Sequence, residues 1–375
     1  MRGAILKVVC VAVCCVAVSA GIASAAGFSE TKSFSSDSLT VTNLIGEIRV
    51  SGHDGSGFEV VVDVQGDDAS RDEVRIDSGR DSLTVVFPES NKYVYPALST
   101  DREISFRPNN DDSWIASLLG SSKVEVSKRG RGLEVWADVE IRVPDGGRLN
   151  LNQGAGVVVA KNVAGDLNLD SHYGTVSVDS VDGNLLVDTG SGDVSVVGVR
   201  GEVNIDTGSG DVDVSDVQCD DVVIDTGSGK VTLVGVAAAS DVSIDTGSGD
   251  VSMTDVSGDE FEIDTGSGDV DGRGIRAESA VIDTGSGKVS LSLAEMGRGR
   301  FDIDTGSGDI TLGLPATAGC EVQAESGSGG VRVDLAGVGN MRREDDDEVE
   351  FTVGGGGARV TLESSSGTIR MRESN

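Results

Sequence analysis

The pentapeptide Asp-Thr-Gly-Ser-Gly constrains the fold of this chain more than any other feature of the sequence. Its successive copies lie 18, 19, 20, 19, 19 and 21 residues apart, and a repeat of this length indicates an array of small stacked units. Degenerate copies extend the series to Asn152 and Asp170 before it and to Glu325 and Glu363 after it. The complete copies start at Asp188, Asp206, Asp225, Asp245, Asp264, Asp283 and Asp304.

Apolar residues keep fixed offsets from the acid of each copy, two before it and three after it. They alternate with polar residues, which is the period of a β-strand, and the Gly-Ser-Gly between them permits the positive φ angles of a tight turn. Each repeat is therefore predicted to run strand, turn, strand, corner. Around Asp225 the apolar residues are Val222, Ile224, Val231, Leu233 and Val236.

One repeat cannot fold alone. Burying five apolar side chains gains roughly 10 kcal/mol, whereas ordering the backbone and side chains costs about 1.5 kcal/mol per residue. Stacked coils share their backbone hydrogen bonds and line equivalent Val and Ile residues into columns. We therefore predict an all-β solenoid of stacked 18–21-residue coils, with an irregular N-terminal part and a handedness that the pattern does not determine.

The same offsets appear more loosely upstream, around Thr42 and Asp77, and residues 58–64 are expected to add a strand. Residues 87–132 break the pattern with three prolines, two tyrosines and a predicted short helix at Ser113–Leu119, whose default role is to cap an exposed edge. The expected division is a signal peptide over 1–25, irregular β coils over 26–86, an insertion or cap over 87–137 and the repetitive solenoid over 138–375.

The first 25 residues have the features of a cleaved secretion signal. Arg2 and Lys7 precede an apolar stretch, and Ala23-Ser24-Ala25 has the small-x-small pattern of a cleavage site. An uncleaved N-terminal anchor is the alternative, because the apolar run is near spanning length. We expect an exported protein, located in the periplasm, cell envelope or outside the cell, with no integral membrane span after cleavage.

Charge narrows the range of partners. The chain carries 30 Lys plus Arg against 63 Asp plus Glu, for a net charge of −33. It therefore offers no basic surface for nucleic acid and would be repelled by anionic lipid headgroups. The expected partner is an unidentified envelope or surface component, either protein or glycan.

Several motifs make the sequence similar to the bacterial β-strand-repeat proteins called putative adhesins, which carry a domain of unknown function. The resemblance extends over nearly all of residues 30–373 and implies a secreted or envelope β-solenoid with no assigned reaction. The insertion at 87–132 lies outside the usual pattern of the family. The motifs, besides the repeats, are Leu39–Asn43 with Gly46–Val50, Val143–Gly147, and Gly354–Leu362 with Gly367–Met371.

The repeat acids are interpreted as structural residues. Asp-Thr-Gly-Ser after two aliphatic residues is also the signature of aspartic proteases, but that chemistry needs two carboxylates that share one proton across a two-fold axis, not a row of them. We expect each Asp to accept backbone N–H bonds within its own turn, with Thr in support. Bound calcium is an alternative, because a column of carboxylates attracts hard cations; otherwise no cofactor or metal site is expected.

The remaining reactive residues are few. His53 and His172 are the only histidines, and Cys219 and Cys320 are the only cysteines after residue 25, with no metal-ligand spacing among them. His172-Tyr173 is read as replacing Thr-Gly in the turn after Asp170, which marks a candidate contact point. The two cysteines are expected five coils apart, too far for a disulfide.

The sequence therefore predicts a non-enzymatic, adhesin-like interaction module with no catalytic residues. The alternatives are a β-helix enzyme acting on polysaccharide and a calcium-binding solenoid. The two aromatic residues inside the array, Phe261 and Phe301, fall on core offsets, so they would not form the exposed platform that a polysaccharide enzyme generally uses. Any specificity is expected on the edge where coil length varies, for example residues 234–241 or 292–300.

Overall fold

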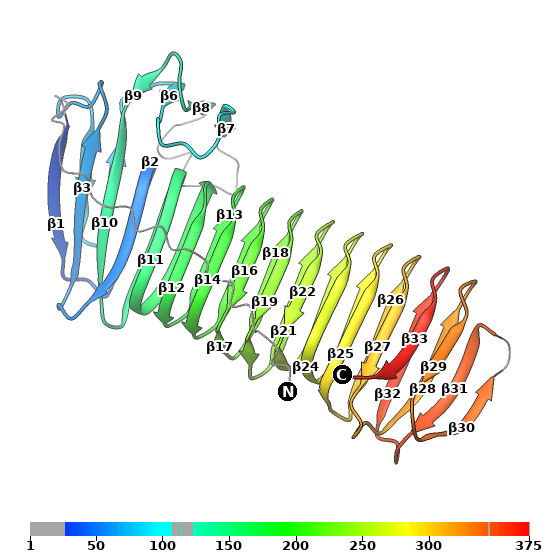
Figure 1. Cartoon of the computed structure of the whole chain (residues 1–375). Helices are drawn as coiled ribbons and strands as arrows, with labels where there is room; N and C mark the ends of the chain where they lie inside the picture. Colours follow the sequence, from blue (N-terminus) through cyan, green and yellow to red (C-terminus); the bar gives the residue numbers. More distant parts are fainter. Residues whose placement is uncertain (1–26, 107–113, 115–122, 344–345, 375) are drawn as a thin grey trace, which may run out of the picture.

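The computed structural model describes residues 27–106, 114, 123–343 and 346–374. It is an elongated stack of β coils with a small sheet attached near its N-terminal end (Figure 1). The all-β solenoid predicted from the repeats is confirmed. Residues 1–25, expected to be the signal peptide, lie outside the described residues, as does the helix expected at Ser113–Leu119 except for Trp114.

Each coil contributes one strand to a first wall, which carries the repeat acids, and one to a second wall, which follows the Gly-Ser-Gly turn. In spatial order the first wall is β5 (Ser82–Val86), the start of β2 (Ser38–His53), both ends of β11 (Gly147–Tyr173), β13 (Leu185–Thr189), β15 (Val203–Thr207), β18 (Val222–Thr226), β21 (Asp241–Thr246), β23 (Ser257–Thr265), the end of β24 (Val270–Thr284), β26 (Arg300–Thr305), β32 (Ala358–Ser364), β28 (Cys320–Ser326), β31 (Glu348–Val353) and β30 (Val338–Arg343).

The second wall runs beside the first. In spatial order it is β1 (Phe28–Phe34), β3 (Phe58–Gln65), β10 (Trp136–Pro144), the end of β2, the middle of β11, β12 (Val176–Asp182), β14 (Val194–Arg200), β16 (Val212–Ser215), β19 (Val231–Val234), β22 (Val251–Thr254), the start of β24, β25 (Val289–Met296), β27 (Ile310–Leu314), β33 (Ile369–Glu373) and β29 (Val331–Asp334). A narrow third side includes β17 (Gln218–Cys219) and β20 (Ala237–Ala238).

The predicted register holds through the array. Asp206, Asp225 and Asp245 are direct partners in the parallel pairing of β15, β18 and β21, and Thr42 aligns with Asn152 in the pairing of β2 with β11. The five apolar offsets around Asp188, Asp206, Asp225 and Asp245 point inward; around Asp225 all five side chains are at most 1% exposed. The core is therefore a set of columns of Val, Ile and Leu, as the alternation predicts.

The second glycine of each turn stacks on its counterpart one coil away. A Cβ added to Gly249 would lie 1.6 Å from the carbonyl oxygen of Gly229. Real atoms do not approach so closely, so this column accepts only glycine. The repeat thus requires its last Gly for close backbone approach.

Asp77 is not the acid of a coil, contrary to the sequence-based expectation. The segment forms an antiparallel hairpin of β4 (Arg75–Ser78) with β5, and Thr84 rather than Asp77 aligns with Thr42. An alternating apolar pattern does not distinguish a hairpin from two strands of a coil. The strand expected at residues 58–64 is present as β3.

The coils are also not stacked in sequence order at the C-terminal end. Asp304 pairs with Glu363, and Glu363 pairs in turn with Glu325. The last two strands of the chain, β32 and β33, therefore lie between the Asp304 coil and the Glu325 coil (Figure 1). The expectation that the Glu363 coil follows the Glu325 coil is wrong.

The insertion contains a four-stranded sheet of β6 (Lys92–Val94), β7 (Ile104–Phe106), β8 (Val124–Ser127) and β9 (Leu133–Glu134). Tyr95 packs on Trp136 of β10 with ring centroids 5.9 Å apart. Trp114 donates its indole N–H to Asp170 Oδ2 at 2.8 Å. These two contacts attach the insertion to the first coils of the stack.

Candidate functional site

The turn of each repeat is organised by the residue that follows the acid. This residue is buried in every coil, in a continuous inward column of Asn43, Gln153, Ser171, Thr189, Thr207, Thr226, Thr246, Thr265, Thr284, Thr305, Ser364 and Ser326. In the later coils its hydroxyl oxygen accepts the N–H of the second turn glycine, as Thr265 does from Gly268 at 2.9 Å. Thr265 also donates to the carbonyl of Gly249 in the neighbouring coil at 3.2 Å. We expected these turn contacts from Asp, but Thr makes them.

The same five-residue turn has a second hydrogen-bond arrangement in the earlier coils. There the glycine N–H donates to a serine carbonyl in the next coil, as Gly192 does to Ser209 at 3.0 Å. The hydroxyls of Thr189 and Thr207 then have no hydrogen-bond partner, although they are buried. The buried hydroxyl of Thr226 in the next coil also has no partner. Gly192 has a φ of 152°, which is in the region that Gly-Ser-Gly was predicted to permit.

The repeat acids form an outward column along the first wall. Of the six acids from Asp206 to Asp304, all of them described, none accepts a hydrogen bond from its own turn; a structural role for the column therefore stays a prediction. Burial first, and then the neighbouring carboxylates, raise the pKa of Asp225 and Asp264, and burial and Asp283 raise the pKa of Asp304. Burial, together with the like charges of neighbouring coils, thus makes ionisation of these three acids less favourable.

A second charged column follows the turn, five residues after each acid. Its carboxylates do accept backbone N–H groups from the next coil: Asp211 Oδ1 accepts from Lys230 at 2.9 Å, and Asp269 Oδ1 accepts from Lys288 at 2.8 Å. Neither lysine forms an ion pair with a described residue within 4.0 Å. The stacking expected for this column is therefore present.

His172 and Tyr173 do lie at an irregular turn, but they occupy different positions from those we expected. Asp170 aligns with Asp188 and Ser171 with Thr189, so His172 and Tyr173 replace Gly and Ser, not Thr and Gly. Both side chains are half-buried. They lie next to Asp170, the acid that receives the indole N–H of Trp114.

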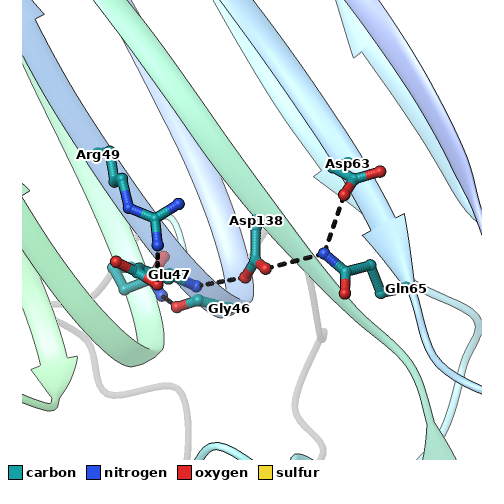
Figure 2. Close-up of polar contacts among 7 residues, drawn as sticks. Gly46, Glu47, Arg49, Asp63, Gln65 and Asp138 are labelled. Atoms are coloured by element: carbon teal, nitrogen blue, oxygen red, sulfur yellow. Dashed lines mark hydrogen bonds and ion pairs between the residues drawn. The ribbon is translucent and has the colours of Figure 1, made fainter. Parts of the chain in front are cut away.

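A cluster of three carboxylates crosses the N-terminal part of the second wall (Figure 2). Asp138 accepts the backbone N–H of Glu47 at 2.8 Å and the side-chain amide of Gln65 at 3.0 Å, and this amide also donates to Asp63 at 2.9 Å. Arg49 pairs with Glu47. The pKa of Asp138 is raised, mainly because the carboxyl is partly buried. The hydrogen bond from the Glu47 N–H opposes this effect, and the negative charge of Glu47 adds to it. The sequence pattern does not reveal this cluster, because its members meet only when β2, β3 and β10 pair.

The structure also bears on the two cysteines and on the calcium hypothesis. Cys219 and Cys320 are free and buried, and burial raises the pKa of each thiol to about 11. Because the Glu363 coil intervenes, they are farther apart than the five coils expected. Within the described residues, no group of three or more His, Cys, Asp or Glu is arranged to hold a metal ion.

No helix in the described part of the chain is long and apolar enough to cross a membrane. No curated protein matches the sequence. A crystal structure of a putative cell adhesion protein from Clostridium sporogenes matches over 92% of this chain and 99% of that one, with 11% identity and a TM-score of 0.17. A TM-score this low supports no inference about function.

The Toastrack DUF4097 family model matches residues 63–295 and, in a second match, residues 201–372. These matches cover most of the chain, including the whole repeat array. They agree with the resemblance to β-strand-repeat proteins of unknown function. The chain therefore belongs to the Toastrack DUF4097 family.

Proposed function

We propose that this protein is a non-enzymatic interaction rod of the cell envelope or surface, which binds its partner through its side walls. The proposal rests on the strands that cover the two ends of the stack. β3 and β1 add antiparallel to β10 at one end, and β31 and β30 add antiparallel to β28 at the other. The ends are thus closed to further parallel coils, whereas the walls are long and regular.

The walls differ in chemistry. The first wall carries the acid column, while the outward positions of the second wall, from Ser177 to Thr311, are mostly small hydroxyl residues. A regular surface of this kind suits a polymer or an extended partner. Export to the envelope and the absence of a cofactor are parts of the same proposal.

The repeat carboxylates give no support for proteolysis. Asp206, Asp225 and Asp245 are neighbours in a parallel ladder on one wall, whereas an aspartic protease requires two carboxylates facing each other. The cluster around Asp138 brings a half-buried carboxyl of raised pKa next to the carboxylates of Glu47 and Asp63, which lie on two other strands. It is therefore the residue to vary when testing for an enzyme.

The test is a pull-down from envelope extracts with the full-length protein, beside a screen for cleavage of polysaccharides. We expect a captured partner and no cleavage. Turnover of any polysaccharide would overturn the non-enzymatic assignment, and its loss in Asp138→Asn would place the reaction at the carboxylate cluster. Failure to retain any component of the extract would overturn the interaction role.

A further inference from the structure

A small cavity lies between the insertion and the first turns of the array. Its volume is about 290 Å³, close to the lower end of the roughly 300–1,000 Å³ of small-molecule sites. It is therefore large enough for one small ring and not for an extended ligand. Its lining residues are Ile104, Ser105, His172, Tyr173, Gly190 and Ser191.

The cavity owes its shape to the two residues that break the repeat. Tyr173 stands where the next turn has Ser191, so an aromatic ring occupies a place that is otherwise a serine at a turn tip. The ring is half-buried against the core, and the Tyr173 hydroxyl has no hydrogen-bond partner among the described residues. Ser105 of β7 and Ser191 add two more hydroxyls around the same space.

The charged residues around the cavity determine whether its ligand can carry a charge. Among the described residues, no Lys or Arg lines the cavity, the acid column begins beside it at Asp170 and Asp188, and the chain has a net charge of −33. Phosphates, sulfates and uronic acids would therefore be repelled. The described lining residues also include no carboxylate that could hold an amine, so an uncharged ligand fits best.

We propose that this cavity binds one ring of a neutral polysaccharide, an assignment that rests on the proposed interaction function and names its ligand class. The C–H face of a sugar packs against an aromatic ring. Its hydroxyls both donate and accept hydrogen bonds, which matches the hydroxyls of Tyr173, Ser105 and Ser191. The site lies at the junction of insertion and array, so the insertion contributes one wall of it.

The experiment compares the full-length protein with the double variant His172→Gly/Tyr173→Ser, which restores the residues of the neighbouring turns and should fold. Binding is measured by affinity electrophoresis in gels containing a neutral glucan, a neutral mannan, polygalacturonate or chitosan. We expect a neutral polymer to retard the parent, with a loss of about tenfold in affinity in the double variant. Tyr173→Phe should lose severalfold, and Ser248→Ala, at an exposed turn tip outside the cavity, should lose nothing. Polygalacturonate should retard neither the parent nor the double variant, whereas the polycation chitosan should retard both equally because the chain has a net charge of −33.

Each other outcome overturns the assignment. Equal affinity of the parent and the double variant for a neutral polymer would place the site elsewhere on the rod and leave the interaction function intact. Retardation by polygalacturonate, or a weaker retardation of the double variant than of the parent by chitosan, without retardation by a neutral polymer would show that the ligand is charged. No retardation by any polymer other than chitosan, combined with capture of a protein from envelope extract, would refute the sugar assignment while supporting the proposed function.

Discussion

Different hydrogen bonding of the repeat turn predicts that one substitution has different costs in two coils whose Asp-Thr-Gly-Ser-Gly turns are identical in sequence. Thr→Val keeps the shape of the side chain and removes only its hydroxyl. In Thr265 that hydroxyl accepts the N–H of Gly268 at 2.9 Å and donates to Gly249 at 3.2 Å. In Thr226 it is equally buried and makes no hydrogen bond.

The magnitudes follow from these contacts. Thr265→Val leaves the buried N–H of Gly268 unpaired, which costs about 1–3 kcal/mol, and loses a second hydrogen bond worth about 0.5–1.5 kcal/mol. A total near 2–4 kcal/mol is expected. Thr226→Val removes a buried hydroxyl that has no partner, so stability should stay the same or rise by up to about 1 kcal/mol.

Urea unfolding, followed by far-UV circular dichroism, measures the difference. Long arrays can unfold in parts, so the two variants should be compared by transition midpoint together with slope. We expect Thr265→Val to shift the midpoint to lower urea and Thr226→Val to leave it in place. Equal shifts in the two variants would refute the two arrangements of the turn.

Three further predictions concern the columns. Ile244→Asp puts an unpaired charge into the core and should lower the melting temperature strongly, whereas the outward Ser243→Asp should be nearly silent; similar melting curves would contradict the alternation. Like charges at about 4.8 Å repel by roughly 0.9 kcal/mol even in water. Changing Lys230 and Lys288 together to Asp should therefore destabilise the protein at low salt, and less at high salt. If millimolar calcium restores the stability of this variant and sodium chloride at equal ionic strength does not, the calcium alternative is favoured. Because the pKa of Asp264 is raised in the folded protein, ionisation of its carboxyl destabilises the fold as pH rises through that pKa. Asp264→Asn should therefore be more stable than the parent at pH 7 and equally stable near pH 3. Thermal unfolding of both proteins at the two pH values measures this difference.

The register of the array can be predicted from the sequence because similar apolar residues recur around the acid of successive coils. Once Asp206 and Asp225 share their apolar offsets, only one alignment buries all of them. The alternation also places the residue after each acid inward, so the burial of Thr226 could have been read from the same pattern. The Asp was assigned the turn contacts instead, because Asx residues favour such turns in general.

The order of the last coils could not be predicted. The coils of Glu325 and Glu363 carry apolar residues at the same four offsets, so the pattern alone allows either of them to stack on the coil of Asp304. The choice depends on the hairpin of β30 and β31, which takes the chain past the end of the stack before β32 returns. The Asp138 cluster was equally out of reach, since it depends on strands that are far apart in the sequence.

The closed ends explain how a long parallel stack can remain a single molecule. An unpaired parallel edge is a template for another chain, and a solenoid has such an edge at each end of every wall. Here antiparallel strands cover three of those edges, and the fourth, β29, is only four residues long and carries Arg332 and Asp334. The N–H of Val331 is moreover paired with the carbonyl of Asp346. End-to-end growth is thus disfavoured at both ends of the rod, and the surface left for a partner is the side walls and the junction with the insertion.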